Sequence, residues 1–448
     1  MSSKAPGSWS KASLSVMVLT MVMVLLPPAT PAHADEEFSG SLPNGTQWIA
    51  AVPDDWNGTL LLHSHGYTPS FVPFPNPAPS IDPTQPGYVP ASVELLDLGY
   101  AVVASSYADK GWALPTAPQD QLDSLQAAIA AIGSEPELVL AYGTSMGGLV
   151  TAKLAESAGD IIDGAMPTCG IVAGGVDLNN YQLDGAHAIS QLLADGTIPI
   201  AGYGTQDEAF AASGALQAAV DAAVTADTPE TRARVALAAA FFQLDPSDLE
   251  GIIGFVTPAR FDLITAAGGE SGWNEGVDYW RLFRQSPYRR VVSDLYRAAG
   301  LSLHEDLKTL TETADVPFDE AAVESMLSHS QPDGNLQMPV FSIHTTRDPL
   351  VPAEHEEEYA DDVRSEHKSR LFRQAFVDRE GHCAFTAAEL VAGIKVLEER
   401  VETGRWPATS VNPHKLNRLA SSLNLGDSAF VHFRPGEFIG DRSDSIRR

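Results

Sequence analysis

The segment from Glu137 to Ser157 constrains the fold of this chain more than any other. An apolar run over Glu137–Tyr142 leads directly into Gly143-Thr144-Ser145-Met146-Gly147, and a helical pattern follows at Leu149–Ser157. In this G-x-S-x-G pattern, a sharp turn between a strand and a helix exposes the serine hydroxyl, and the glycines let the two elements approach closely. The helix N-terminus then faces the developing negative charge. The segment therefore predicts Ser145 as a nucleophile, the alternative being an ordinary glycine-rich turn.

Short apolar runs alternate with helical patterns from Asp35 to about residue 176. Alternation of this kind indicates strand–helix–strand units and a parallel sheet that is buried on both faces. The expected strands are Trp48–Val52, Thr59–His65, Tyr100–Ser106, Glu137–Tyr142 and Ile162–Met166, and the expected helices are Gln119–Ile132 and Leu149–Ser157.

The rhythm changes over about Gly175–Leu336, where the pattern is mostly helical. Strand patterns return at Pro339–His344 and Leu371–Val377, and the helix Leu390–Val401 follows a capping box, Thr386-x-x-Glu389. We therefore predict that the helical block is an insertion and not part of the sheet. Within it, helices are expected to start at Thr228-Pro229-Glu230 and Asp245-Pro246-Ser247-Asp248, and to span Val291–Ala298 and Asp319–Leu327.

A serine nucleophile needs a base, and position selects one of the twelve histidines. His382 follows a predicted strand and precedes the last long helix, as the base does in the chain order Ser…Asp…His. Asp348, in a proline-stiffened loop after the strand Pro339–His344, is the predicted acid that orients the base. Asp378 and Glu380 are rival acids, predicted to be solvated loop charges. Among the other histidines, a core position is expected for His344, a place beside a different site for His63 and His65, and surface positions for His355, His367 and His414.

Acyl chemistry also needs two backbone N–H groups that stabilise an oxyanion. Met146, the residue after the nucleophile, is expected to supply one of them. Tyr67, at the end of His63-Ser64-His65-Gly66-Tyr67, is expected to supply the other, with Gly66 permitting close approach. The alternative is a strand that ends in an ordinary turn.

Together these motifs resemble those of the α/β-hydrolase fold superfamily, especially its secreted serine esterases and lipases. The resemblance covers roughly residues 45–176 and 337–403, and it rests on the Ser145 turn, His65-Gly66, Asp348-Pro349-x-Val351-Pro352 and Gly381-His382 in the family's order. It implies a mostly parallel sheet flanked by helices, an inserted helical cap, and two-step acyl transfer without a metal or an organic cofactor.

The expected organisation follows from this resemblance. The catalytic core is predicted at residues 35–176 and 335–405, the helical cap at 177–334, and a C-terminal extension at 406–448. The extension contains one strand-like run, Ala429–Phe433, and is otherwise expected to be a charged, frayed end.

The chain has two cysteines, Cys169 and Cys383. In an oxidising compartment an isolated pair is a disulfide candidate. A weaker resemblance, to tannases and feruloyl esterases, bears on the pair, because some of these enzymes tie a cysteine beside the nucleophile to one after the catalytic histidine. Cys383 does follow His382, but Thr144 and not a cysteine precedes Ser145. We hypothesise that Cys169 pairs with Cys383 instead.

The first 34 residues have the pattern of a secretory signal peptide. Two lysines give a positive start, Leu14–Leu26 is too short to span a membrane, and Ala32-His33-Ala34 matches a cleavage site. The alternative is an uncleaved anchor. The formal charge of −30 becomes −32 when this segment, with two lysines and no acids, is removed. Such a field repels nucleic acid and anionic membranes. We expect a secreted protein with no nucleic-acid partner and no stable membrane insertion, since no later segment is apolar enough to span.

The resulting hypothesis is a carboxylic ester hydrolase that acts on a small-molecule or polymeric ester. A serine peptidase or amidase of the same fold is the first alternative, because capped members of this fold also cleave peptides. A non-catalytic binding protein on the same scaffold is the second. The identity of the substrate, its acyl chain length and the oligomeric state do not follow from the sequence.

Three further features bear on the substrate. Thr68–Pro90 holds eight prolines in 23 residues and is either a lid or surface decoration. The four arginines of Arg281–Arg290 either recognise a carboxylate or balance nearby acids. The aromatic residues of the cap form either a substrate pocket or the cap's own core; they are Phe241, Phe242, Phe255, Tyr279, Trp280, Phe283 and Tyr288.

Overall fold

A mixed sheet lies at the centre of the computed structural model, which describes residues 36–73, 75–249 and 252–442. Its strands are β1 (Glu36–Ser41), β2 (Gln47–Val52), β3 (Thr59–Ser64), β4 (Ala101–Ser105), β5 (Leu138–Thr144), β6 (Gly164–Thr168), β7 (Val340–Arg347), β8 (Phe372–Glu380) and β9 (Phe430–Val431). Their order in the sheet is β1-β2-β4-β3-β5-β6-β7-β8-β9. All neighbours from β4 to β8 are parallel, and the antiparallel pairs lie at the two edges. The predicted signal peptide lies outside the described residues.

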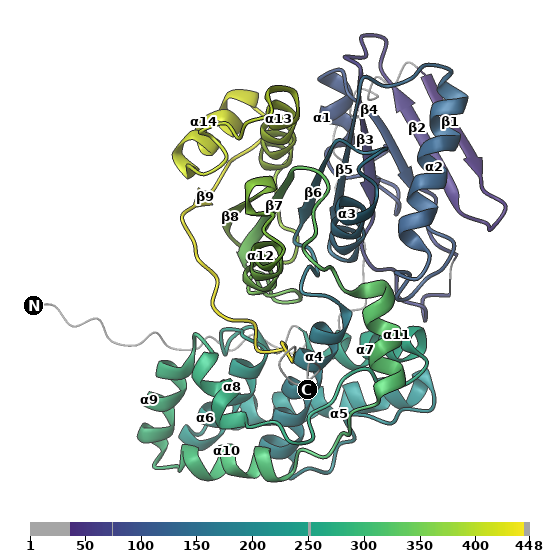
Figure 1. Ribbon diagram of the computed structural model, residues 1–448. Helices are drawn as coiled ribbons and strands as arrows, with labels where there is room; N and C mark the ends of the chain where they lie inside the picture. Colours follow the sequence, from purple (N-terminus) through teal and green to yellow (C-terminus); the bar gives the residue numbers. More distant parts are fainter. Residues whose placement is uncertain (1–35, 74, 250–251, 443–448) are drawn as a thin grey trace, which may run out of the picture.

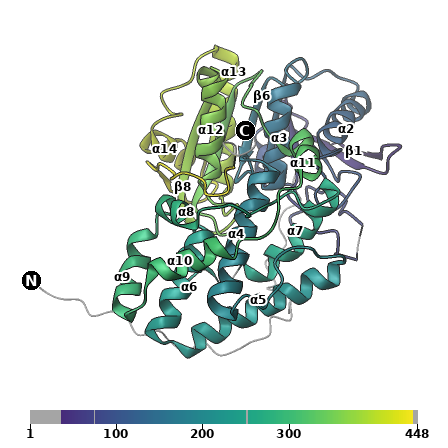
Figure 2. The same ribbon diagram turned by 60° about the horizontal axis from the view of Figure 1, so that its bottom comes forward.

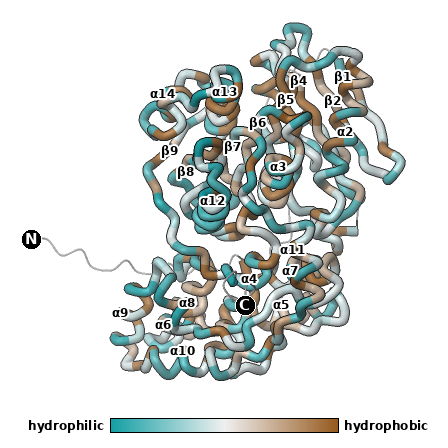
Figure 3. Tube along the Cα trace, in the orientation of Figure 1, coloured by the Kyte–Doolittle hydropathy of each residue, from teal (hydrophilic) through white to brown (hydrophobic). Residues whose placement is uncertain are grey.

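Helices cover both faces of this sheet (Figure 1). One face carries α2 (Ala117–Ile132), α3 (Met146–Ser157) and α12 (His355–Ser365), and the other carries α1 (Ser92–Asp97), α13 (Ala387–Thr403) and α14 (Pro413–Leu423). Successive strand residues point to opposite faces, so Leu60 and Leu62 of β3 pack in one core and Leu61 in the other. The centre of the sheet is correspondingly hydrophobic and α12 largely hydrophilic in Figure 3. The predicted fold class, a mostly parallel α/β-hydrolase sheet flanked by helices, is confirmed.

Four of these elements, β1, α1, α12 and α14, are absent from the sequence-based expectations. β1 is a mostly exposed edge strand, held by its antiparallel pairing with β2 and not by an apolar pattern of its own. α1 has only six residues. α14 lies in the part predicted to be frayed, yet Leu416 and Ala420 bury one side of it against α13. Each of these elements depends on tertiary contacts that a local pattern does not record.

The helical insertion lies between β6 and β7 and forms a layer below the sheet (Figures 1 and 2). Its helices are α4 (Gly175–Ala194), α5 (Gln206–Ala226), α6 (Pro229–Phe241), α7 (Ile253–Ala267), α8 (Tyr279–Gln285), α9 (Arg289–Ala299), α10 (Leu303–Glu312) and α11 (Glu320–Ser330). Thr228 caps α6 as expected, in a capping box with Thr231. The expected helix start at Asp245-Pro246-Ser247-Asp248 is wrong. This segment is a turn, and α7 begins at Ile253.

One cap helix corrects the expectation that no segment after the signal could span a membrane. By length and composition, α5 is apolar enough to do so. In the structure it packs against α4, α6 and α7, and its buried positions follow a helical stripe from Ala209 through Leu216 to Ala223. The apolar composition, rich in alanine, therefore serves a helix of the cap.

The C-terminal tail is not frayed over the described residues. After β9 it crosses from the sheet to the cap (Figure 1), where Phe438 and Ile439 are buried. Gly440 lies against α4 so closely that a β-carbon there would be 2.3 Å from the Asp177 carbonyl oxygen. At the end of this path the buried guanidinium of Arg442 forms an ion pair with the buried carboxylate of Asp184 on α4. The extension thus ties the cap to the core.

This ion pair gives a prediction about stability. Arg442→Met leaves the Asp184 carboxylate buried without its cation, and removing one partner of a buried pair costs about 3–5 kcal/mol. We expect a fall of that size in the free energy of unfolding, measured by urea denaturation followed by tryptophan fluorescence. Arg434→Met is the matched control, because the Arg434 side chain is 88% exposed. Equal stability of the two variants would contradict the role given to the tail.

Candidate functional site

Ser145 lies in the sharp turn between β5 and α3, as the sequence predicts. Its backbone has φ 58° and ψ −122°, a strained conformation for a residue with a side chain. The turn is possible because its glycines are crowded by backbone. A β-carbon at Gly143 would lie 2.2 Å from the Gly147 carbonyl oxygen, and one at Gly147 would lie 2.0 Å from the Ser64 carbonyl oxygen. These contacts force the serine side chain out of the turn.

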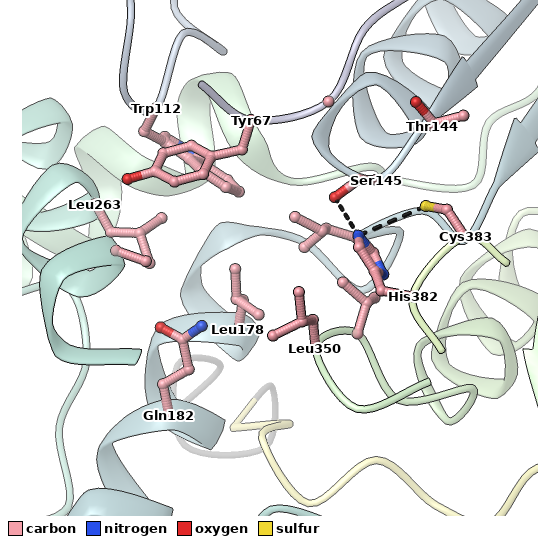
Figure 4. Close-up of a pocket in the computed structure, with 14 residues that line it drawn as sticks. Tyr67, Trp112, Thr144, Ser145, Leu178, Gln182, Leu263, Leu350, His382 and Cys383 are labelled. Carbon is pink, nitrogen blue, oxygen red and sulfur yellow. Dashed lines mark hydrogen bonds between the residues drawn. The ribbon is translucent and has the colours of Figure 1, made fainter. Parts of the chain in front are cut away.

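His382 and Asp348 converge on Ser145 from the ends of two neighbouring strands. His382 follows β8 and Asp348 follows β7. The His382 Nε2 atom lies 2.8 Å from Ser145 Oγ, and its Nδ1 atom lies 2.7 Å from Asp348 Oδ2. Figure 4 shows the imidazole directed at the serine hydroxyl. The structure therefore brings the three predicted residues into one hydrogen-bonded chain, 34 and 237 residues apart in sequence.

The carboxylate of Asp348 is buried and held in place by its own loop. The backbone N–H groups of Leu350 and Val351 each donate to Asp348 Oδ1 at 2.9 Å, which leaves Oδ2 for His382. Burial alone would raise the pKa of this carboxyl, but the charge of His382 and interactions with both neighbouring histidines outweigh burial. They hold the Asp348 pKa below its ordinary value.

His344 on β7 lies behind this carboxylate and is fully buried, as a core position predicts. Its Nδ1 atom is 3.1 Å from Glu356 Oε1 and its Nε2 atom is 2.9 Å from the Val351 carbonyl oxygen. Both partners are acceptors, so both ring nitrogens must carry protons and the ring is an imidazolium. Burial opposes the charge, but the carboxylates of Asp348 and Glu356 raise the pKa of His344 to about 10. A buried cation therefore supports the loop that carries Asp348.

The two residues expected to supply oxyanion donors, Met146 and Tyr67, lie near Ser145. Met146 is the first residue of α3, and the first N–H groups of a helix have no acceptor within the helix. The turn before Tyr67 reaches Ser145 through Gly66, where a β-carbon would lie 3.4 Å from Ser145 Cβ. His65 stacks on Tyr107 with ring centroids 4.0 Å apart and fixes this turn.

Cys169 and Cys383 form a disulfide, the pairing that the sequence suggested. Cys169 directly follows β6, and Cys383 directly follows His382, with Cα atoms 5.3 Å apart. The bond joins positions 214 residues apart and attaches the histidine loop to the centre of the sheet. Cys383 Sγ lies 3.5 Å from His382 Nε2 (Figure 4).

Among the described residues, the two cysteines and His382 form a cluster that resembles a metal site. Cys169, His382 and Cys383 have possible ligand atoms within 4.8 Å of one another. The two sulfurs are bonded to each other, and His382 Nε2 faces Ser145, so the group does not offer three free ligands.

A cavity of about 350 Å³ opens beside Ser145 between the core and the cap. Its walls are mostly apolar or aromatic. The lining residues are Gly66, Tyr67, Trp112, Thr144, Ser145, Ile171, Leu178, Gln182, Ala259, Leu263, Leu350, Val351, His382 and Cys383. The volume suits a small ligand.

Tyr67 and the start of the proline-rich loop that follows it contact two helices of the cap. The Tyr67 hydroxyl and the Ser70 hydroxyl both donate to the Asp262 carboxylate of α7, as does the Ser70 N–H at 2.9 Å. Phe71 also packs edge-on against Phe210 of α5, with ring centroids 4.8 Å apart. The start of Thr68–Pro90 is therefore attached to the cap.

Several side chains lie elsewhere than expected. The surface position predicted for His355 is wrong, because its ring is buried against Phe438 of the tail. Of the rival acids, Asp378 is exposed and Glu380 pairs with Arg347 at 3.6 Å. Of the cap aromatics whose side chains the structure describes, none lines the cavity and most are buried in the cap. The arginines of Arg281–Arg290 are exposed and do not line it either.

The sequence analysis missed Trp112, Gln182 and Asp262. Trp112 lies in a loop without a motif, and Gln182 and Asp262 lie on cap helices. The helical periodicity of the cap gave a signal for buried positions but none for the cavity that they face.

Comparisons with known proteins find a similar amidase and several solved structures of low overall similarity. No family model matches the chain. An o-phthalyl amidase from Xanthobacter agilis is 28% identical over 90% of this chain and 95% of its own length. Feruloyl esterase B from Aspergillus oryzae has 13% identity and a TM-score of 0.39, covering 83% of this chain and 80% of that one. An acylaminoacyl peptidase from Pyrococcus horikoshii has 11% identity and a TM-score of 0.37, covering 78% of this chain and 37% of that one. The likeness to the amidase over most of both chains supports a hydrolase.

The charged state of His344 predicts a pH dependence of stability. Its folded pKa of about 10 lies above the ordinary value of 6.5, so protonation favours the folded state. This contribution is complete below about pH 6.5 and is lost as the pH rises through 10. Between pH 6 and 10, we expect the free energy of unfolding, measured with urea, to fall less in His344→Gln protein than in wild-type protein. His367→Gln, at an exposed position, is the control. Parallel pH curves for wild type and His344→Gln would show that the ring is neutral.

The disulfide predicts that unreduced, denatured protein contains no reactive thiol. A disulfide contributes typically about 2–4 kcal/mol, so the Cys169→Ala/Cys383→Ala protein is expected to lose stability of that order. The number of thiols is measured with a thiol reagent on denatured, unreduced protein, and the loss of stability is measured by urea unfolding of the double variant. Two thiols per chain would contradict the bond.

Proposed function

We propose that this protein is a serine hydrolase in which Ser145, His382 and Asp348 form the catalytic triad. The observation that carries the proposal is the continuous hydrogen-bonded chain from Ser145 Oγ through His382 to Asp348 Oδ2, beside a cavity. The strained turn at Ser145 supports it, because such strain persists where a side chain must be held in one position.

In the proposed mechanism, His382 Nε2 takes the proton of the Ser145 hydroxyl as the oxygen attacks an acyl carbonyl. Asp348 fixes the tautomer of His382 and stabilises the imidazolium. The N–H groups of Met146 and Tyr67 stabilise the oxyanion. His382 then protonates the leaving group, and water repeats the sequence to release the acid and free serine.

The bond that is cleaved is an ester or an amide of a carboxylic acid. A carboxylic ester is the prediction from the sequence. The likeness to an amidase over most of both chains favours an amide as the second candidate. Both reactions use the same triad, so substrates with one acyl group and two leaving groups separate them. A folded protein that binds such compounds and cleaves neither would favour the non-catalytic alternative.

We further propose that residues 35–176 and 335–405 form the catalytic core, that 177–334 form the cap, and that the mature protein is secreted. The disulfide supports export, because such bonds persist in oxidising compartments. The active site needs no metal or organic cofactor in this mechanism.

The nucleophile is tested with Ser145→Ala protein. Loss of a serine nucleophile has cost about 10⁶ in kcat in a related triad system, and we expect a fall of that order on 4-nitrophenyl benzoate. Ser157→Ala, an exposed serine on α3, is the control and should retain full activity. Turnover unchanged in the Ser145→Ala protein would refute the proposed nucleophile.

The type of bond is tested by comparing 4-nitrophenyl benzoate with benzoyl 4-nitroanilide on one protein preparation. Ester turnover with negligible anilide turnover supports the esterase prediction. Comparable kcat/KM values for the two compounds support an amidase. An enzyme that is suited only to esters is expected to cleave the anilide much more slowly, because the anilide has the poorer leaving group. Both activities must disappear together in the Ser145→Ala protein.

A further inference from the structure

One buried amide lies in the apolar part of the cavity. Gln182 on α4 is 5% exposed and lines the space in front of Ser145. Its amide oxygen has no hydrogen-bond partner among the residues that the structure describes. Buried polar groups in proteins are almost always paired, so an unpaired amide at the wall of a cavity requires a partner that the protein itself does not supply.

Gln182 lies at the end of the cavity away from the serine. The cavity wall that leads from Ser145 to α4 begins at Ile171, whose N–H donates to the Ser145 carbonyl oxygen at 3.4 Å. Leu178 and Gln182 then follow on one face of α4, about 6 Å apart along the helix. Figure 4 shows the Gln182 amide pointing from α4 toward Leu263 and Leu178. An acyl group attached to Ser145 would extend along this wall toward the amide.

The other walls define the chemistry of such a group. Trp112 donates its indole N–H to Ser330 Oγ at 2.7 Å, and the Tyr67 hydroxyl donates to Asp262. The polar ends of both rings are therefore engaged outside the cavity, and their apolar surfaces line it. These surfaces suit an aromatic acyl group.

The cavity also excludes a charge at its far end. Among the described residues, no lysine and no arginine lines it. A carboxylate placed beside Gln182 would lose its hydration without gaining a cation, which is costly. A neutral group that donates and accepts hydrogen bonds pairs with an amide at no such cost.

We infer that Gln182 is a specificity-determining residue and that the preferred acyl group is aromatic, with one uncharged hydrogen-bonding substituent at the end opposite the scissile carbonyl. This inference rests on the proposed function, since it takes the acyl group to be attached at Ser145. Gln182 itself takes no part in the chemistry. It pairs with the substrate in the ground state and the transition state alike.

The kinetic test compares 4-nitrophenyl esters of 4-carbamoylbenzoate, 4-methylbenzoate and 4-carboxybenzoate. In Gln182→Leu protein, we expect kcat/KM for the carbamoyl ester to fall about 10- to 100-fold, mainly through KM, with the methyl ester unchanged or faster. Gln191→Leu makes the same change on the same helix outside the cavity and should alter neither. An equal effect of Gln182→Leu on the carbamoyl and methyl esters, or a wild-type preference for the carboxy ester, would overturn the inference.

A binding measurement keeps this test separate from the proposed function. Calorimetry measures the affinity of Ser145→Ala and Ser145→Ala/Gln182→Leu proteins for methyl 4-carbamoylbenzoate and methyl 4-methylbenzoate. Tighter binding of the carbamoyl compound, lost in the double variant, supports the role of Gln182 even if Ser145→Ala protein retains turnover and the proposed nucleophile fails. Equal affinity for the two compounds, or no binding of either, refutes the role of Gln182 and leaves the triad unaffected.

Discussion

The close contact between the backbones of Gly147 and Ser64 is the constraint on which the rest of the site depends. With any side chain at Gly147, α3 would have to move away from the end of β3, and the turn before Tyr67 would no longer lie against Ser145. The same crowding holds Ser145 in its strained conformation. Because β5, β7 and β8 belong to the parallel part of the sheet, their carboxyl ends share one edge, and the loops that carry Ser145, Asp348 and His382 meet there.

The parts of this arrangement that follow from the sequence are those that local patterns encode. Periodicity located the strands β2 to β9 and the helices α2, α3 and α13. The rule that parallel strands share an edge then converted the order Ser145, Asp348, His382 into proximity in space. The pairing of Cys169 with Cys383 was suggested by the presence of two cysteines and by the resemblance to tannases and feruloyl esterases, and the structure places both cysteines at this edge. The catalytic roles of these residues stay predictions.

What the sequence did not reveal depends on contacts between distant segments. A core position for His344 could be predicted from its strand, but the carboxylate of Glu356 that makes its ring cationic lies on a different element. The cap aromatics have a helical spacing that indicates burial, and this spacing does not say whether they face a cavity or one another. The tail looked frayed because its residues are charged, whereas the partner of Arg442 lies 258 residues earlier in the chain.

The cap is attached to the core by more than the two chain crossings at α4 and β7. Asp262 holds the start of the proline-rich loop on one side, and the tail reaches α4 on the other. Both attachments lie close to the cavity, since Tyr67 lines it and the tail packs on the helix that carries Gln182. The shape of the cavity is therefore set jointly by segments from most of the chain.

The attachment of the tail also imposes an order on biosynthesis. Asp184 and the surface that receives Phe438 are synthesised before the segment that covers them, and Arg442 lies 258 residues after Asp184 in the chain. Until then the cap carries a buried acid without its cation and an uncovered apolar surface, which is a state prone to aggregation. The cap therefore cannot complete its folding until the segment that contains Phe438 and Arg442 has been synthesised.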